Sequence, residues 1–340
     1  MTHGATESSW WRRPPAPRGV CAVLLLSLAA LCALPTAAVQ AASTAHIIAL
    51  LNRERAANGI PAGITETPAW TAACKAHDAY EHANHVFGHA ETEGKPGYTA
   101  AGNLIAQTSV LAEGIQWGPG DPYDNAPFHL FDLLNPRISS TGAADAEGFG
   151  CVEIELGTLR IPPAGVHGYS YPGNRRRGVP VSEIAQEQPM TPAQTVGLTA
   201  KATGPNLLVY FDGPWTNGSR VQVQAATMTS PAGSMPLRWI DNTTSDLLAP
   251  TGAILIPVKP LRPRTTYHVR VRGVVTGVVP GTSVEEAILP ACRQEADGSV
   301  QCGQPASTAC FEDFATQLAV CGLSRTWSVA ESFSFTTARR

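Results

Sequence analysis

Two histidines, His89 and His129, are the residues of this 340-residue chain whose type and surroundings could do chemistry. Each lies beside a turn-rich stretch and next to an apolar run. A neutral imidazole can accept a proton near neutral pH, and it is a common metal ligand.

The stretch around His129 contains no glutamate that could support this histidine. No glutamate lies between Gly114 and Ala146, and Asp121 or Asp124 would have to substitute. A carboxylate orients an imidazole and can itself act as a general base. Two imidazoles alone can hold Zn²⁺ weakly, with water in the remaining positions. We therefore expect His89 and His129 to bind Zn²⁺ weakly if at all, and we expect no other cofactor.

Helices followed by a few late strands are expected to position these residues. Ser43 is a good N-cap for a first amphipathic helix, which Gly59 would end. Pro68 is suited to the first turn of a second helix. This order of elements is typical of an α+β fold. Helices are expected over residues 43–58, 68–86, 104–117 and 128–134, and a strand over residues 149–156.

The N-terminus predicts export. Arg12, Arg13 and Arg18 precede a short apolar run from Val20 to Leu34, and small residues follow. This is the pattern of a secretory signal peptide over residues 1–41, which would be removed together with its two cysteines. The mature protein is expected to be secreted, periplasmic or at the cell surface, without a transmembrane helix.

The six cysteines outside that segment are even in number, which in an exported chain indicates disulfides. Cys74 and Cys151 are expected to pair because both lie on apolar faces of neighbouring elements. The other four fall in a short C-terminal segment, where two short loops would result from pairing Cys292 with Cys302 and Cys310 with Cys321. Other connectivities among these four stay open.

From about residue 193 the apolar pattern takes a period of two, which predicts a β-sandwich over residues 193–340. Strands are expected over residues 207–211, 221–225, 252–258, 267–271 and 332–337. The stretch from Leu261 to Tyr267 resembles the fibronectin type III motif whose tyrosine forms a tyrosine corner. Residues 158–192, rich in Pro, Gly and Arg, are expected to be a linker or an extension of the first domain. Residues 274–326, with the late cysteines, would be an insertion.

Residues 43–157 resemble the CAP superfamily of cysteine-rich secretory, antigen 5 and pathogenesis-related proteins, and most of all its bacterial SCP-like branch. The motifs that carry the resemblance, in order, are Leu51-Asn52 with Arg55, Ala76-His77, His89 nine residues before Tyr98, Ala101-Gly102-Asn103 at the family's Gly-Glu-Asn, and His129 before Leu133-Leu134-Asn135-Pro136. The resemblance implies an α-β-α sandwich with a surface cleft between the histidines, which His89, His129, Tyr98 and Asn103 would line. Gly102 stands where the family has the first of two cleft glutamates.

These observations favour a secreted, non-enzymatic CAP protein that binds a small apolar or lipid ligand, or a cell-surface protein or glycan, through the cleft around His89 and His129. On this hypothesis Gly102→Glu would tighten Zn²⁺ binding. A net charge of −3 without a basic stripe argues against nucleic acid as a partner.

The alternative is an extracellular hydrolase, a peptidase or cell-envelope enzyme, that uses the two histidines with a displaced acid. A third possibility is a structural surface protein with a vestigial cleft. A carboxylate within hydrogen-bond reach of either imidazole would favour the enzyme, and its absence would favour binding.

Overall fold

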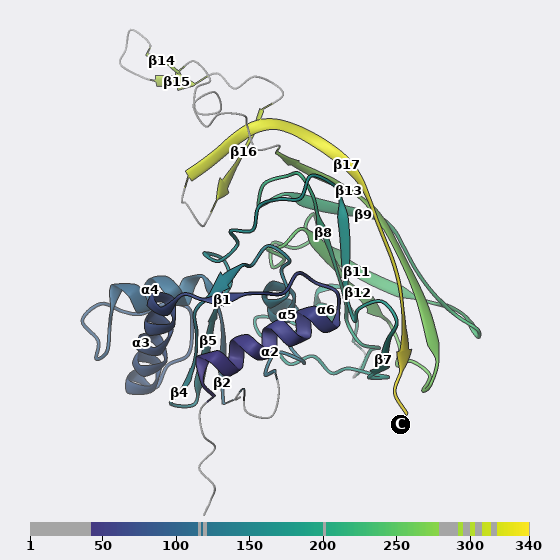
Figure 1. The fold of residues 1–340 in the computed structure, drawn as a ribbon, viewed down its shortest axis with the longest axis horizontal. Helices are drawn as coiled ribbons and strands as arrows, with labels where there is room; N and C mark the ends of the chain where they lie inside the picture. Colours follow the sequence, from purple (N-terminus) through teal and green to yellow (C-terminus); the bar gives the residue numbers. More distant parts are fainter. Residues whose placement is uncertain are drawn as a thin grey trace, which may run out of the picture. The chain divides into compact units, whose positions relative to one another are not determined.

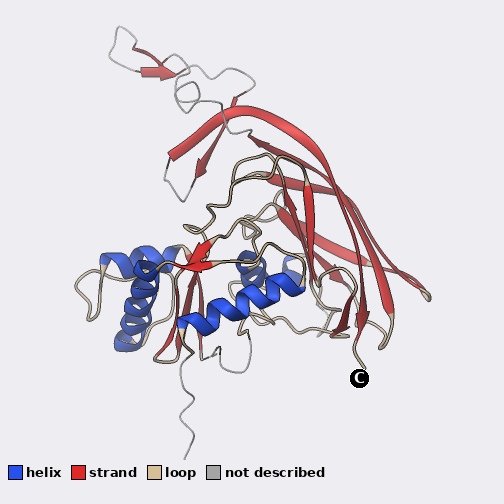
Figure 2. Cartoon of the chain, viewed as in Figure 1, coloured by secondary structure: helices blue, strands red, loops and turns tan. Residues whose placement is uncertain are grey.

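The structure is a computed structural model that describes residues 42–114, 117, 121–199, 202–278, 292–294, 300–302, 308–313 and 318–339, with side chains up to residue 278 and again from residue 325. The expected signal peptide, residues 1–41, lies outside the described residues. The fold mixes helices with strands in several sheets, in agreement with the predicted α+β class (Figures 1 and 2).

The first helices begin and end at the residues that their caps predict. The Ser43 hydroxyl accepts a hydrogen bond from the His46 amide at the start of α2 (Thr44–Ala57), and Gly59 follows its end with a φ of 73°. Pro68 occupies the first turn of α3 (Pro68–Asn84). The remaining described helices are α4 (Ala100–Gln107), α5 (Pro127–Leu133) and α6 (Pro192–Thr195).

The prediction of a helix over residues 104–117 is wrong in its position. The Thr99 hydroxyl caps α4 by accepting a hydrogen bond from the Gly102 amide, so the helix begins earlier and ends at Gln107. Residues after Thr108 form the strand β2 (Ser109–Glu113), whose first four residues are buried. Pairing with a buried neighbouring strand outweighs the helical pattern of this segment.

A small antiparallel sheet supports these helices, in the order β2, β5 (Phe149–Glu153), β4 (Ala143–Ala146). The predicted disulfide between Cys74 and Cys151 is confirmed, and it joins α3 to β5. A link that closes so long a loop contributes roughly 4 kcal/mol in the chain-entropy view. Two further short strands, β1 (Thr65–Glu66) and β3 (Ser140–Thr141), pair in parallel.

The C-terminal part forms two antiparallel sheets, apart from one parallel edge strand, as the period-two pattern predicts. Their apolar faces pack together into one core. The first sheet has the order β11 (Leu237–Asp241), β12 (Gly252–Pro257), β8 (Leu207–Asp212), β6 (His167–Tyr171). The second has the order β10 (Gly233–Met235), β9 (Arg220–Ser230), β13 (Thr266–Val278), β17 (Leu318–Thr337), β16 (Thr308–Asp313), with β7 (Arg176–Val179) paired in parallel to β17.

The sheet that contains β8 is covered on both faces. Leu208 and Tyr210 belong to the core of the helical part, whereas Val209 and Phe211 belong to the core between the two sheets. The Tyr210 ring stacks on Phe131 of α5 with centroids 4.6 Å apart, and its hydroxyl donates to the Phe131 carbonyl oxygen. The helical part and the sandwich therefore share a continuous apolar interior.

Residues 158–192, expected to be a linker or an extension, supply strands to both sheets of the sandwich through β6 and β7. In the predicted insertion, strands β14 (Cys292–Gln294) and β15 (Val300–Cys302) pair with each other. Within the described residues, no helix combines the length and apolar character needed to cross a bilayer.

Candidate functional site

His89 lies in the loop between α3 and α4 and is exposed. Its Nδ1 donates to the carbonyl oxygen of Ala106, 2.7 Å away, in the last turn of α4. A carbonyl accepts only, so the proton is on Nδ1 and the lone pair is on Nε2. The first predicted histidine is thus oriented by backbone rather than by a carboxylate.

The position expected to lack a carboxylate is in fact filled by one. The side chain of Glu91 reaches the space beside Gly102, so that a Cβ built on Gly102 would collide with Glu91 Oε1. Glu91 Oε2 accepts from the Thr99 amide at the start of α4, 2.9 Å away. Glu91 comes from the loop before the helix, which is why comparison of position 102 alone cannot find it.

The partner of Glu91 is His77, not His89. Glu91 Oε1 lies 3.0 Å from His77 Nδ1, and the Gly88 carbonyl oxygen lies 3.1 Å from His77 Nε2. Glu81 Oε1 approaches Nε2 at 3.5 Å. The side chains of His77, Glu81 and Glu91 are all buried.

Both ring nitrogens of His77 therefore face acceptors, an arrangement that suits the imidazolium form. Burial by itself lowers the pKa of His77, but the hydrogen bonds and charges of Glu81 and Glu91 outweigh it and the pKa is raised. His77, which the sequence indicates as a helix-packing residue, is thus the centre of a buried ion-pair network that ties α3 to the loop before α4.

His129 carries the displaced acid that the alternative hypothesis requires. Its Nδ1 lies 3.0 Å from Glu187 Oε2, and the exposed fractions of the two side chains are 22% and 1%. A buried carboxylate beside a partly exposed imidazole fixes the tautomer and leaves Nε2 without a hydrogen bond among the described residues. Neither Asp121 nor Asp124, the expected substitutes, forms this contact.

Glu187 Oε2 also accepts a hydrogen bond from the Phe128 amide, 2.9 Å away. It thereby caps α5, whose N-cap residue Ala126 has no capping side chain. Burial raises the pKa of Glu187, while the hydrogen bond and charge of His129 oppose the rise. Glu187 lies in the Pro-rich stretch after the first domain, beyond the window in which a family glutamate would be sought.

An aromatic stack connects His129 to the interior. Its ring lies against Tyr123 with centroids 5.7 Å apart, and Tyr123 in turn meets Trp117 edge-on at 5.8 Å. Asp78 is also fully buried, and neither of its carboxylate oxygens has a hydrogen-bond partner of regular geometry among the described residues. Burial, the nearby charge of Glu81 and that of Asp145 raise the pKa of Asp78 to about 8, with His77 opposing the rise.

The other two predicted cleft residues have different positions. The Asn103 side-chain oxygen accepts from the Glu91 amide at 2.8 Å, so Asn103 holds the loop of Glu91 against α4. Tyr98 is half-buried, and its amide donates to the Lys95 carbonyl oxygen. Within the described part of the chain, no hydrogen bond or ion pair links His129 to His89, Asn103 or Tyr98.

The described residues contain no group of three or more His, Cys, Asp or Glu side chains able to hold a metal ion. What the arrangement can do chemically is move a proton at His129 Nε2. Comparisons of the chain with protein-family models, with curated proteins and with solved structures find no significant match.

Proposed function

We propose that the chain is an extracellular CAP-type protein with a fibronectin III-like sandwich, and that it is a hydrolase in which His129 acts as general base. The order and spacing of the sequence motifs support the CAP proposal, together with a disulfide that joins α3 to the central strand β5. The Tyr267 hydroxyl, which accepts from the Arg262 amide five residues upstream, supports the sandwich proposal because a tyrosine corner has this contact.

The observation that carries the enzymatic proposal is the 3.0 Å contact between His129 Nδ1 and Glu187 Oε2. With its proton directed at the carboxylate, the imidazole offers the Nε2 lone pair to a water molecule. Water that loses a proton to Nε2 can attack the acyl carbon of an amide. As the C–N bond then breaks, the imidazolium, which Glu187 stabilises, returns the proton to the leaving nitrogen. A peptide or cell-envelope amide is the corresponding substrate class.

The test is hydrolysis by the exported chain of a peptide mixture and of muropeptides, followed by mass spectrometry. His129→Ala should abolish turnover, because general-base catalysis contributes about 10²–10⁴-fold. Glu187→Gln keeps an acceptor for the Phe128 amide but loses the negative charge, so it should lower kcat while the melting temperature changes little.

His89→Ala serves as the matched control, since its imidazole is bound to a backbone carbonyl and should leave the rate unchanged. Absence of turnover by the wild-type chain on both substrate classes, or a rate that survives His129→Ala, would refute the hydrolase.

A second candidate is the non-enzymatic binding of an apolar or lipid ligand. It is favoured by exposed apolar side chains near His89, because Val86, Phe87 and Leu104 are 44%, 47% and 48% exposed. Lipid extraction from the purified chain, compared with Phe87→Ser, tests it independently. Bound lipid that is lost in Phe87→Ser, with no turnover, would establish binding in place of catalysis.

A further inference from the structure

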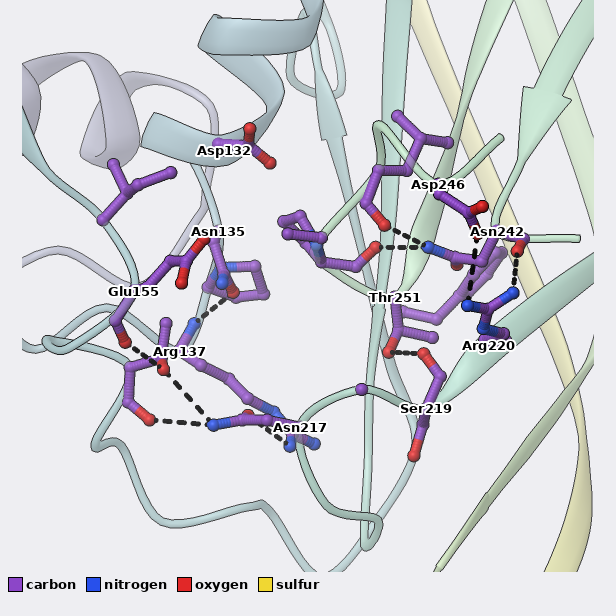
Figure 3. Close-up of a pocket in the computed structure, with 18 of the residues that line it drawn as sticks. Asp132, Asn135, Arg137, Glu155, Asn217, Ser219, Arg220, Asn242, Asp246 and Thr251 are labelled. Atoms are coloured by element: carbon purple, nitrogen blue, oxygen red, sulfur yellow. Dashed lines mark hydrogen bonds and ion pairs between the residues drawn. The ribbon is translucent and has the colours of Figure 1, made fainter. Parts of the chain in front are cut away.

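A cavity of about 320 Å³ lies between the helical part and the sandwich, and neither His89 nor His129 lines it (Figure 3). It is bounded by the end of α5 with the loop that follows, by residues after β5, and by two loops of the sandwich. Its volume is at the lower end of the range for small-molecule sites. Asp132, Glu155 and Phe211 line it, together with several amide and hydroxyl side chains.

One wall is held rigid by the Asn242 carboxamide. Its oxygen accepts from the amides of Val221 and Gly252, and its nitrogen donates to the carbonyl oxygens of Leu248 and Pro250. All four hydrogen-bonding positions of this side chain are therefore used within the protein. Asn242 shapes the cavity but has no position left for a ligand.

The opposite wall is held in the same way. Arg137 donates to Asp212 at 2.9 Å and to the Asn217 oxygen at 3.0 Å, and the Asn217 nitrogen donates to the Thr158 carbonyl oxygen at 3.1 Å. These hydrogen bonds join the helical part to the sandwich along this wall of the cavity. Asn217 and Asn242 thus serve the fold, whereas Asn135 uses only its side-chain oxygen among the residues described, and this oxygen accepts from the Arg137 amide.

Two acidic side chains of the cavity remain without a charged partner. Arg137 is paired with Asp212, and Arg220 lies 3.2 Å from Asp246. Asp132 and Glu155 belong to no ion pair within the described part of the chain, and Asp132 Oδ1 is buried without a hydrogen-bond partner there. Burial and the charge of Glu155 raise the pKa of Asp132 well above its usual range, and burial raises the pKa of Glu155.

We propose that this cavity binds an organic cation, with an ammonium group between Asp132 and Glu155 and an apolar stem along Ile154, Phe211 and Leu248. An ammonium group supplies donors only, which satisfies the unpartnered carboxylate oxygen and offsets the repulsion between the two acids. The side chains of Ile154, Phe211 and Leu248 line the same cavity and suit an aliphatic chain.

Other ligand classes fit the described residues less well. An anion would need a free cation, but the arginines of the cavity are paired. A sugar would need free amides and hydroxyls, whereas Asn217 and Asn242 are already bonded internally. A metal ion would need further ligands beside the two acids, and no group of three suitable side chains occurs in the described ranges.

The experiment is calorimetric titration of the exported chain with pentylammonium chloride at pH 7.5 and low salt. Its uncharged isostere, 1-pentanol, is the matched control ligand, and calcium chloride and glucose test the other classes. The proposal expects pentylammonium to bind at least about tenfold more tightly than pentanol, because only the cation can form charge-assisted hydrogen bonds with the two carboxyl groups.

Asp132→Asn and Glu155→Gln should each weaken pentylammonium binding by about tenfold or more, whereas Asp246→Asn, on the same cavity but paired with Arg220, should leave it unchanged. Asp132→Asn and Glu155→Gln both preserve the size of the side chain. If Asp132→Asn fails to fold, Glu155→Gln alone still tests the proposal. The proposal is overturned by equal binding of pentanol, by pentylammonium binding indifferent to both variants, or by binding of calcium or glucose but not of the amine.

Discussion

The Glu91 carboxylate occupies the space that a side chain at position 102 would need, so Gly102 and Glu91 together fill one site from two places in the chain. The missing glutamate at position 102 is therefore not a gap in the structure. The expectation that Gly102→Glu would add an oxygen ligand for Zn²⁺ stays a prediction, but a glutamate at this position would first have to displace the Glu91 carboxylate.

Substitution of Gly102 should destabilise the protein. A Cβ at this position collides with Glu91 Oε1 and with the Thr99 hydroxyl, which would disturb the cap of α4 and the contact with His77. We expect Gly102→Ala to lower the unfolding free energy by about 1–3 kcal/mol, and Gly102→Glu by more. Urea denaturation measures the effect. Gly165→Ala, at an exposed position with room for a Cβ, is the control. An equal loss of unfolding free energy in Gly102→Ala and Gly165→Ala would contradict the collision.

Asp78 should make the protein less stable as the pH rises. Its folded pKa of about 8 lies above the usual value of 3.8, so the folded state holds the proton more tightly than the unfolded state. The cost of ionising the buried group is absent below about pH 4 and grows up to about pH 8. Asp78→Asn should therefore raise the melting temperature at pH 8 and flatten its pH dependence. The Asp246 side chain is 89% exposed, so Asp246→Asn should neither raise the melting temperature at pH 8 nor flatten its pH dependence.

His77 should stabilise the fold most at mildly acidic pH. A histidine whose folded pKa is raised contributes stability that is complete below the unfolded value of about 6.5 and is lost as the pH rises through the folded value. His77→Gln leaves buried Glu91 without its charged partner and should cost about 3–5 kcal/mol at pH 5.5. The cost should shrink at higher pH. His82→Gln, whose side chain is 56% exposed, should change stability by less than about 0.5 kcal/mol at either pH.

The four late cysteines should form the two short-range disulfides. The strand register places Cys292 opposite Cys302 and Cys310 opposite Cys321. Directly opposite residues of antiparallel strands have Cα atoms about 4.5–5.5 Å apart, which is within the range for a disulfide. Peptide mapping without reduction should recover both pairs. A peptide that links Cys302 to Cys310 would show a different connectivity.

The period-two segments of the sequence predict the strands of the sandwich well because turn residues separate them and one face of each is apolar. The Leu207–Phe211 run differs, since its residues are apolar on both faces, a pattern typical of a strand buried on both sides. Read in that way, it would have indicated that another layer covers this sheet. The helix expected over residues 104–117 failed because pairing of β2 with β5 is a long-range effect that local pattern does not contain.

The candidate site was predictable in its histidines but not in their partners. His89 and His129 stand out by type and spacing, whereas Glu187, the partner of His129, and Glu91, the partner of His77, come from loops whose path depends on the whole fold. Glu187 lies 58 positions after His129, and no local pattern in the sequence connects the two. Carboxylates brought together by tertiary structure have no fixed spacing, which explains why the site looked incomplete.

The sheet formed by β11, β12, β8 and β6 has a consequence for how such a chain could evolve. A domain that is exchanged between genes must have a surface that tolerates contact with water when the domain folds alone. Here the sheet face that carries Tyr210 is excluded from water because Phe131 and its neighbours cover it. Transfer of the sandwich to another gene would expose that face, so the two halves are expected to be inherited as a single hereditary unit.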